Sequence, residues 1–227
     1  MPTIPAFAAI ETPPAVGRMS TGGRHSPLFT HIFVAHDLDR APRRTQLALM
    51  EAMVTRRVVF TGETQAVALP EPFIVIGTAD ADSVTLLPEM AERFMLSLDY
   101  DFRLSCILTS HHPEPLFSLR EVRALQALAS NVHTSNDVLR YIRDIVVSLR
   151  KQQAIRISPA PMGSVAFIEA VKCLAILNGM AFATPAHVRE MAGPALAHRI
   201  QLYDDFRVTT RSRAVIDAVL GSVSAPV

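Results

Sequence analysis

Two short runs of consecutive apolar residues stand out along the chain, separated by a stretch with helical spacing. The runs cover residues 29–35 and 73–78, and both are rich in β-branched and aromatic side chains. They predict strands, and their continuous rather than alternating apolarity predicts burial on both faces, as in a parallel α/β sheet. The first run ends at the polar stretch 36–39, which we expect at an edge of that sheet. Residues 45–53 have apolar side chains at helical spacing, and Pro42 suits the start of such a helix.

Turn-forming residues and shorter segments fill the rest of the first half. Residues 57–69 predict a β-hairpin that turns near Gly62. A short helix is expected over residues 88–94, and a further strand over residues 95–100. Residues 1–28 are rich in proline and predict an irregular N-terminal arm.

After Pro115 the sequence is typical of a helical bundle. Ser118 and Glu121 have the spacing of a capping box, and Ser135 is placed to cap the next helix. The apolar residues of that next helix form one stripe, made of Val138, Leu139, Ile142, Ile145, Val146 and Leu149.

Two more helices complete the predicted bundle. One is expected over residues 164–177 and ends at Gly179, and another opens at Thr184, which precedes a proline. The pattern therefore divides the chain into part of an α/β layer over residues 29–112 and a helical region over residues 116–227.

The charge balance bears on the classes of partner. With 22 basic and 21 acidic residues the chain has a formal net charge of +1, which provides no field for general attraction to nucleic acid or to an anionic membrane. No apolar run approaches the ~20 residues that span a bilayer. The N-terminus lacks the basic region and apolar core of a signal peptide, and Cys106 and Cys173 each lie in an apolar stretch as core thiols do. We therefore expect a cytoplasmic protein with no membrane and no nucleic-acid partner.

The lysines exclude one kind of nucleotide site from this sequence. A phosphate-binding loop has the pattern G-x-x-x-x-G-K-[ST], in which the lysine reaches the β- and γ-phosphates and the hydroxyl holds Mg²⁺. The chain has two lysines, Lys151 and Lys172, which are followed by glutamine and cysteine. Neither lysine belongs to such a loop.

A set of segments along the chain carries a family resemblance. They are residues 26–42, 45–53, 62–64, 69–78, 87–89, 92–94, 158–159, 183–185 and 198–199. In this order and spacing the sequence resembles the MoxR and magnesium-chelatase branch of the AAA+ ATPases, over about residues 26–202. Residues 110–113 and 138–144 are most similar to a fungal magnesium-chelatase-like group.

The resemblance implies a fold of class α/β plus all-α. Residues 29–112 would form a partial AAA+ P-loop NTPase core, with strands 3 to 5 and the hairpin that precedes the sensor strand. Residues 116–227 would form the helical lid. The opening strand, the phosphate loop and the first helix of the family have no counterpart in this sequence.

The resemblance also places a nucleotide site at the end of the first predicted strand. Family members have Asp-Glu there, for Mg²⁺ and for activating water, whereas this chain has His36 and Asp37. Imidazole is a poor partner for a hard cation that prefers oxygen, and the Asp37 carboxylate is one methylene shorter than a glutamate. His36, Asp37 and Asp39 are the candidate cofactor-binding positions, with Asp37 as a degenerate catalytic residue. The alternative is that they are simply polar residues at a strand end.

Two further family positions differ from the pattern of an active site. Asp80 stands where the family has the asparagine of sensor 1, and a carboxylate there would repel phosphate. The lid sequence at Ser158, Pro159 and Ala160 lacks the arginine of sensor 2, and Arg156 precedes the proline.

One arginine matches the family pattern. Arg93 corresponds to the arginine finger, which reaches the nucleotide of a neighbouring subunit, and a guanidinium suits that role because it is always charged and forks onto phosphate oxygens. The alternative is an ordinary arginine at a helix end. His111 and His112 lack further ligands at zinc spacing and indicate a solvated loop.

Three hypotheses for function follow. The first is a degenerate AAA+ subunit, inactive alone, that forms a homo- or hetero-oligomer with AAA+ subunits and either serves as a scaffold or supplies Arg93 in trans. The second is a fragment of a complete ATP-hydrolysing AAA+ ATPase, and the third is an interaction module based on the lid. ATP and Mg²⁺ are cofactors by family resemblance only, and so is a partner with a metal-dependent adhesion domain; the sequence itself indicates no metal site.

Overall fold

The computed structural model describes residues 29–59, 66–80, 86–99, 117–203 and 209–226. The chain divides into two compact units, Met1–Arg93 and Phe94–Val227, which we call the sheet unit and the helical unit. The predicted arm over residues 1–28, the turn at Gly62, Cys106 and the His111-His112 pair lie outside the described residues.

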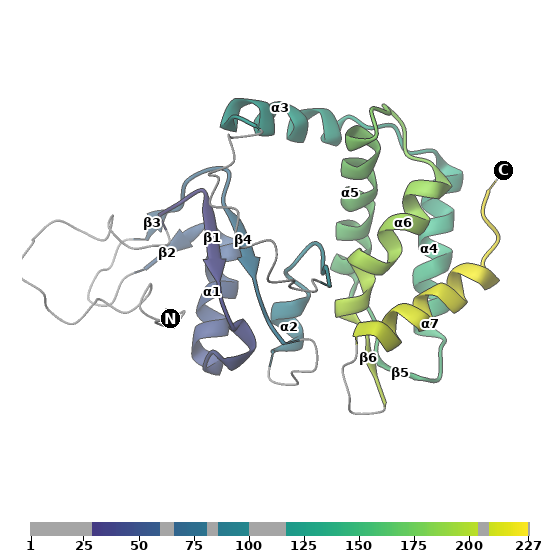
Figure 1. Cartoon of the computed structure of the whole chain (residues 1–227), viewed down its shortest axis with the longest axis horizontal. Helices are drawn as coiled ribbons and strands as arrows, with labels where there is room; N and C mark the ends of the chain where they lie inside the picture. Colours follow the sequence, from purple (N-terminus) through teal and green to yellow (C-terminus); the bar gives the residue numbers. More distant parts are fainter. Residues whose placement is uncertain (1–28, 60–65, 81–85, 100–116, 204–208, 227) are drawn as a thin grey trace, which may run out of the picture. The chain divides into compact units, whose positions relative to one another are not determined.

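A parallel pair of strands organises the sheet unit. Strand β1 (Ile32–Ala35) pairs in parallel with β4 (Ile74–Gly77), so the predicted parallel arrangement is confirmed (Figure 1). The connection between them passes through the short 3₁₀ helix η1 (Leu38–Arg40), helix α1 (Arg43–Thr55) and the antiparallel pair β2 (Arg57–Val58) and β3 (Val67–Ala68). Helix α2 (Pro88–Ala91) follows β4.

The two faces of this parallel pair differ. Phe33 and Ala35 are buried, as are the residues Leu49 and Ala52 of α1. On the opposite face the side chains of β1 and β4 are exposed, because no described element covers them; these are Ile32 (55%), Val34 (47%), Ile74 (39%) and Ile76 (49%). The expectation of burial on both faces is therefore wrong for this chain.

The helical unit contains the larger helices. They are α3 (Leu119–Ser130), α4 (Asn136–Arg150), α5 (Pro161–Leu177), α6 (Pro185–Leu196) and α7 (Thr209–Ser222). The 3₁₀ helix η3 (Ala197–Arg199) follows α6, and the short strands β5 (Ile155–Ile157) and β6 (Gln201–Leu202) pair antiparallel. Helices α4, α5 and α6 pack side by side, and α3 lies across one end of α5 (Figure 1).

The core of the helical unit is built from the stripe predicted on α4. Val138, Ile142, Ile145, Val146 and Leu149 are buried there together with residues of α5, α6 and α7. Leu139 is the exception to the predicted stripe, because it is 36% exposed. Burial of large aliphatic side chains stabilises a fold by roughly 1.5–3 kcal/mol each, so this cluster is the main source of stability in the unit.

Local hydrogen bonds set the starts of the helices, as predicted. The Ser118 hydroxyl accepts a hydrogen bond from the Glu121 amide, and the Glu121 carboxylate accepts one from the Ser118 amide. The bond to the carboxylate lowers the pKa of Glu121. The Ser135 hydroxyl accepts from the Val138 amide, and Thr184 caps α6.

Residues 95–99 differ from the prediction, since they form no strand. Their backbone is instead tied to the helical unit, where the Ser97 amide donates to the Pro194 carbonyl at 2.8 Å. Among the described residues, no helix is both long and apolar enough to cross a membrane.

Candidate functional site

The ends of β1 and β4 meet at the point where the sequence predicts a site. The Thr78 amide donates to the Ala35 carbonyl at 2.9 Å, and the Leu38 amide donates to the Thr78 carbonyl at 2.9 Å. These bonds continue the parallel ladder beyond the strands and fix the backbone of residues 36–38 against Thr78. The polar residues that follow β1 are therefore held in one arrangement at the carboxyl edge of the pair.

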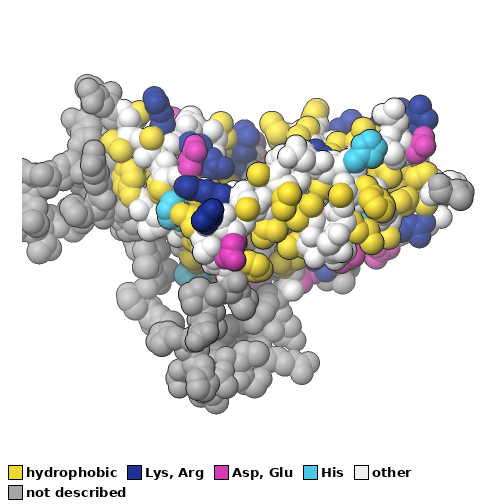
Figure 2. Space-filling model, turned by 90° about the horizontal axis from the view of Figure 1, so that it is seen from above, with side chains coloured by type: hydrophobic (Ala, Val, Ile, Leu, Met, Phe, Trp, Pro, Cys, Tyr) yellow, Lys and Arg dark blue, Asp and Glu magenta, His cyan; other side chains and the backbone are white. Residues whose placement is uncertain are grey.

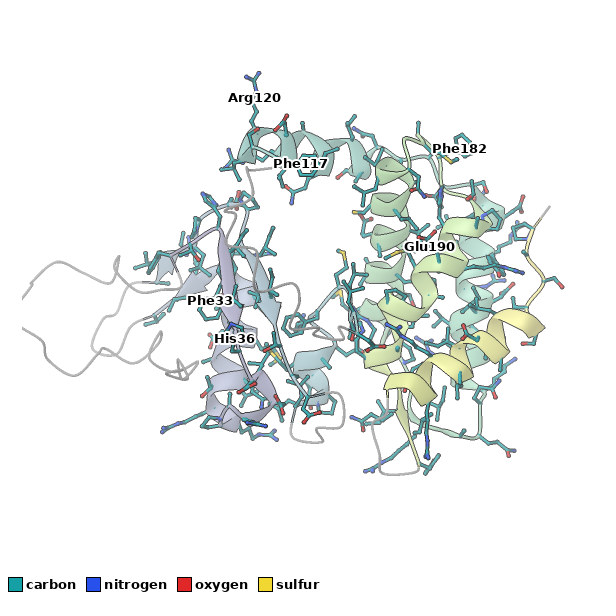
Figure 3. All side chains as sticks on the ribbon, in the orientation of Figure 1. Phe33, His36, Phe117, Arg120, Phe182 and Glu190 are labelled. Carbon is teal, nitrogen blue, oxygen red and sulfur yellow. The ribbon has the colours of Figure 1, made fainter. Side chains whose placement is uncertain are left out.

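Thr78 is the residue that organises this edge. Its hydroxyl accepts from the Asp37 amide at 3.1 Å and lies 3.3 Å from Nδ1 of His36. The His36 ring, at the carboxyl end of β1 (Figure 3), is thus turned toward a neutral hydroxyl from β4. Sequence analysis did not single out Thr78, because its partners are more than forty residues away along the chain.

Asp37 adopts the left-handed conformation, with φ 50° and ψ 45°. Aspartate tolerates this region better than most residues, since its short side chain can bond locally. Its carboxylate lies 3.9 Å from Nη1 of Arg40, and both side chains are at least half exposed. An ion pair of this length and exposure contributes little to stability.

The other two predicted carboxylates lie in different surroundings. Asp39 is buried in η1, with 3% of its surface exposed, whereas Asp80 is exposed after β4. The structure therefore brings His36 and Asp37 together with Thr78, but it places Asp39 in the interior of the sheet unit. No group of three or more His, Cys, Asp or Glu able to hold a metal ion occurs among the described residues.

A buried glutamine of α1, Gln46, connects two segments of the sheet unit. The Gln46 side chain donates to the Ala41 carbonyl at 3.0 Å and accepts from the Leu87 amide at 2.8 Å. It thereby joins the start of α1 to the start of α2, the helix that precedes Arg93. A glutamine at a helix start carries no distinctive sequence pattern, so the prediction had no means of finding it.

Arg93 lies two residues beyond α2, in a turn closed by its amide on the Met90 carbonyl at 3.1 Å. Its side chain is exposed. Arg93 therefore lies on the surface of the described part of the sheet unit. A role in trans would require such exposure.

The lid positions form a separate set within the helical unit. Pro159 and Ala160 directly precede α5, and Arg150 donates to the Pro159 carbonyl at 3.2 Å. Arg156 lies on β5 with an exposed side chain.

Comparisons with known proteins agree with this architecture. Residues 17–96 match the model of the ATPase family associated with various cellular activities (AAA), and residues 147–219 match the AAA lid domain. The chain is 26% identical to the uncharacterized protein YeaC of Bacillus subtilis, covering 90% of this chain and 68% of that protein. It is also 26% identical to the chaperone MoxR1 of Mycobacterium tuberculosis, covering 92% of this chain and 61% of that protein.

A solved structure has the same fold. It is that of a protein assigned as an ATPase from Cytophaga hutchinsonii, which superposes with a TM-score of 0.73 at 20% identity, over 89% of this chain and 68% of that one. The chain thus spans roughly two thirds of the length of each of these proteins.

Proposed function

Because the chain belongs to the AAA family of ATPases, with a core segment and a lid, we propose that it is a MoxR-like subunit of an ATP-driven remodelling assembly whose own nucleotide site is degenerate. In this proposal the 227-residue polypeptide hydrolyses no ATP by itself. It joins other AAA subunits as a scaffold and offers Arg93 to the nucleotide of a neighbour. The finer grouping with magnesium-chelatase-like proteins is part of the same proposal.

The observation that carries the proposal is the donor set at the end of β1. A magnesium triphosphate needs hard oxygen donors and cationic groups for the phosphates. Here an imidazole lies against the Thr78 hydroxyl, and the exposed carboxylate of the next residue, Asp37, lies 3.9 Å from Nη1 of Arg40. The residues present do not fit the group, so we derive no hydrolytic step through it.

Two further positions and the lysine content support the same conclusion. Hydrolysis of a nucleoside triphosphate depends on several charges that stabilise one transferring phosphoryl group. Alanine at position 160 and aspartate at position 80 each remove a contribution, and the sequence has no lysine in a phosphate loop. In this proposal several such contributions are lost together. Arg93 is then the residue that can act on a nucleotide, which is that of a neighbouring subunit.

Co-expression with a complete AAA ATPase that carries its own phosphate loop tests the proposal. We expect a stable mixed complex, in which the Arg93→Ala variant lowers ATP turnover relative to the unchanged chain. Arg120→Ala, an exposed arginine on α3 (Figure 3), is the matched control and is expected to leave turnover unchanged. Failure to form any complex, or equal turnover for Arg93→Ala and its control, contradicts the proposal.

A second candidate is that the chain is part of a complete ATPase, and the lengths of the relatives favour it. They extend beyond the matched region by about a third. An in-frame Gly-Lys-Thr loop in the genomic sequence upstream would support this reading.

A third candidate, an interaction module based on the lid, is favoured by an apolar surface. Apolar side chains gather on the face seen in Figure 2, over α3 and the adjoining end of α5. The exposed apolar residues of these elements and the following loop include Leu128, Leu177, Met180 and Phe182. Limited proteolysis that degrades the sheet unit quickly and spares the helical unit would favour the lid as the working part.

A further inference from the structure

The exposed face of β1 and β4 is an apolar surface of the sheet unit that the proposed function leaves unused. It consists of Ile32, Val34, Ile74 and Ile76, which are between 39% and 55% exposed. The ladder places Ile32 opposite Ile74 and Val34 opposite Ile76, so the side chains form two adjacent pairs. All four are aliphatic and β-branched, and neighbouring cross-strand pairs of such residues form a continuous apolar surface.

The composition of the two strands limits the kind of partner that fits this face. Their sequences are Ile-Phe-Val-Ala and Ile-Val-Ile-Gly, in which no side chain is charged or forms hydrogen bonds. The face therefore offers a partner neither a charge to complement nor a side chain to bond. A polar partner surface would lose its hydrogen bonds to water here without replacement, so the matching surface is another aliphatic one.

A second copy of this chain carries such a surface. An interface with two-fold symmetry brings the same patch of two copies together, so the patch must be complementary to itself. The exposed face meets this condition, because its four side chains are similar in size and shape and neither strand has a charge that would repel its counterpart. We propose that the exposed face of β1 and β4 is a self-association site, at which the strand pairs of two copies stack face to face.

The size of the face determines the strength of this association. Two sheets that stack face to face lie about 10 Å apart, and the side chains of both fill the layer between them. A stable protein interface buries ~800 Å² on each partner. Four side chains that are each about half exposed supply only part of this area, so the association is weak and depends on concentration.

Cross-linking through a single cysteine tests the proposal. In the full chain with Cys106→Ala and Cys173→Ala, we introduce Val34→Cys and add a bifunctional maleimide with a reach of about 10 Å. One cysteine per chain links two copies only where the residue lies near its own counterpart, as it does across a two-fold axis. We expect a covalent dimer whose yield rises with protein concentration.

The matched control is Val54→Cys on α1 in the same background. Val54 is 53% exposed and Val34 is 47% exposed, so the two cysteines are similarly accessible in a single copy. The yield of dimer from Val54→Cys should be roughly tenfold lower, because Val54 lies outside the proposed contact. Equal yields from the two cysteines overturn the proposal.

A substitution at Ile74 tests the role of the face itself. Ile74→Asp places a carboxylate in the proposed contact and should lower the dimer yield of Val34→Cys roughly tenfold. If that variant does not fold, Ile74→Thr keeps the β-branched shape and should lower the yield about threefold. A yield that remains unchanged in a folded Ile74 variant overturns the proposal.

Reaction with a monofunctional maleimide separates a second copy from other occupants of the face. We expect Val34→Cys to react as fast as Val54→Cys in dilute solution and more slowly in concentrated solution, where the second copy covers it. Protection at every concentration would show that another part of the same chain covers the face, and equal rates at every concentration would show that nothing does. Either result overturns the proposal. The experiments contain no nucleotide, so their outcome is independent of the role proposed for Arg93.

Discussion

His198 shows how the fold controls the ionisation of a single residue. Burial of the ring, and next the positive charge of Arg199, lower the pKa of His198 from 6.5 to about 4, although hydrogen bonds to the carbonyls of Phe94 and Pro194 act in the opposite direction. The folded state therefore binds this proton more weakly than the unfolded state does. Stability from the neutral ring is fully present above pH 6.5 and is lost as the pH falls from about 6.5 toward about 4.

The lowered pKa of His198 leads to a prediction for unfolding in acid. Between pH 7.5 and pH 4.5 the unchanged chain should lose about 2–3 kcal/mol more unfolding free energy than His198→Gln, whose side chain does not titrate. Denaturant unfolding at the two pH values measures this difference, and the remaining histidines cancel in the comparison. Equal losses in the two proteins would show that the His198 ring does not stay neutral in the folded state.

Gly163 leads to a second prediction for a single residue. A Cβ at this position would lie 3.1 Å from Cδ of Arg199 and 3.3 Å from Cβ of Pro159, so Gly163→Ala should destabilise the helical unit by about 1–3 kcal/mol. Gly221 on α7 has nothing within 4 Å of the same atom, and Gly221→Ala is therefore the control. It should be neutral or stabilising by up to about 1 kcal/mol. Thermal unfolding that ranks the two variants in the opposite order would refute the crowding at Gly163.

The candidate site was predictable only in part from its residues. The positions of His36 and Asp37 follow from where an apolar strand ends, because strand ends are encoded locally. Thr78 and Gln46 act on partners about forty residues away or on another helix, and such contacts have no local pattern. The burial of Asp39 was also not predicted, because burial depends on contacts that have no local sequence pattern.

At the scale of elements, the exposed face of β1 and β4 is the feature with the clearest consequence. Four β-branched side chains lie opposite one another in register, Ile32 with Ile74 and Val34 with Ile76. Contiguous exposed apolar surface of this kind promotes association. Among the described residues β4 pairs with β1 alone.

We therefore expect the chain to bind a hydrophobic dye and to self-associate in a concentration-dependent way. Val34→Thr combined with Ile76→Thr should lower both, because threonine keeps the β-branched shape and adds a hydroxyl. Substitution of exposed Val54 on α1 by threonine is the matched control outside this face. Sedimentation velocity showing a monomer for the unchanged chain at all concentrations would contradict the expectation.

The elements themselves were predicted with unequal success. Helix starts were correct at Ser118, Ser135 and Thr184, because a cap is a local hydrogen bond between neighbours in the sequence. The strand expected over residues 95–100 is absent from the described residues 95–99, where anchors on the helical unit replace strand pairing. Tertiary contacts of this kind override local preference.

At the scale of the whole molecule, the chain combines a sheet unit and a helical unit that each have their own buried residues. One family model matches residues 17–96, almost all of them in the sheet unit, and the other matches residues 147–219 of the helical unit. The sequence predicted strands and helices followed by a helical region, with the change near Pro115, whereas the compact units divide between Arg93 and Phe94. The proposed function requires that the chain does not hold a nucleoside triphosphate by itself.

Calorimetric titration of ATP with Mg²⁺ into the 227-residue chain tests this property most directly. We predict no saturable heat and no shift of the thermal midpoint at millimolar nucleotide, because the end of β1 presents an imidazole and one exposed carboxylate near Arg40. A control titration into a complete AAA ATPase should show saturable binding under the same conditions. Stoichiometric binding to this chain with a Kd below roughly 0.1 mM would contradict the account.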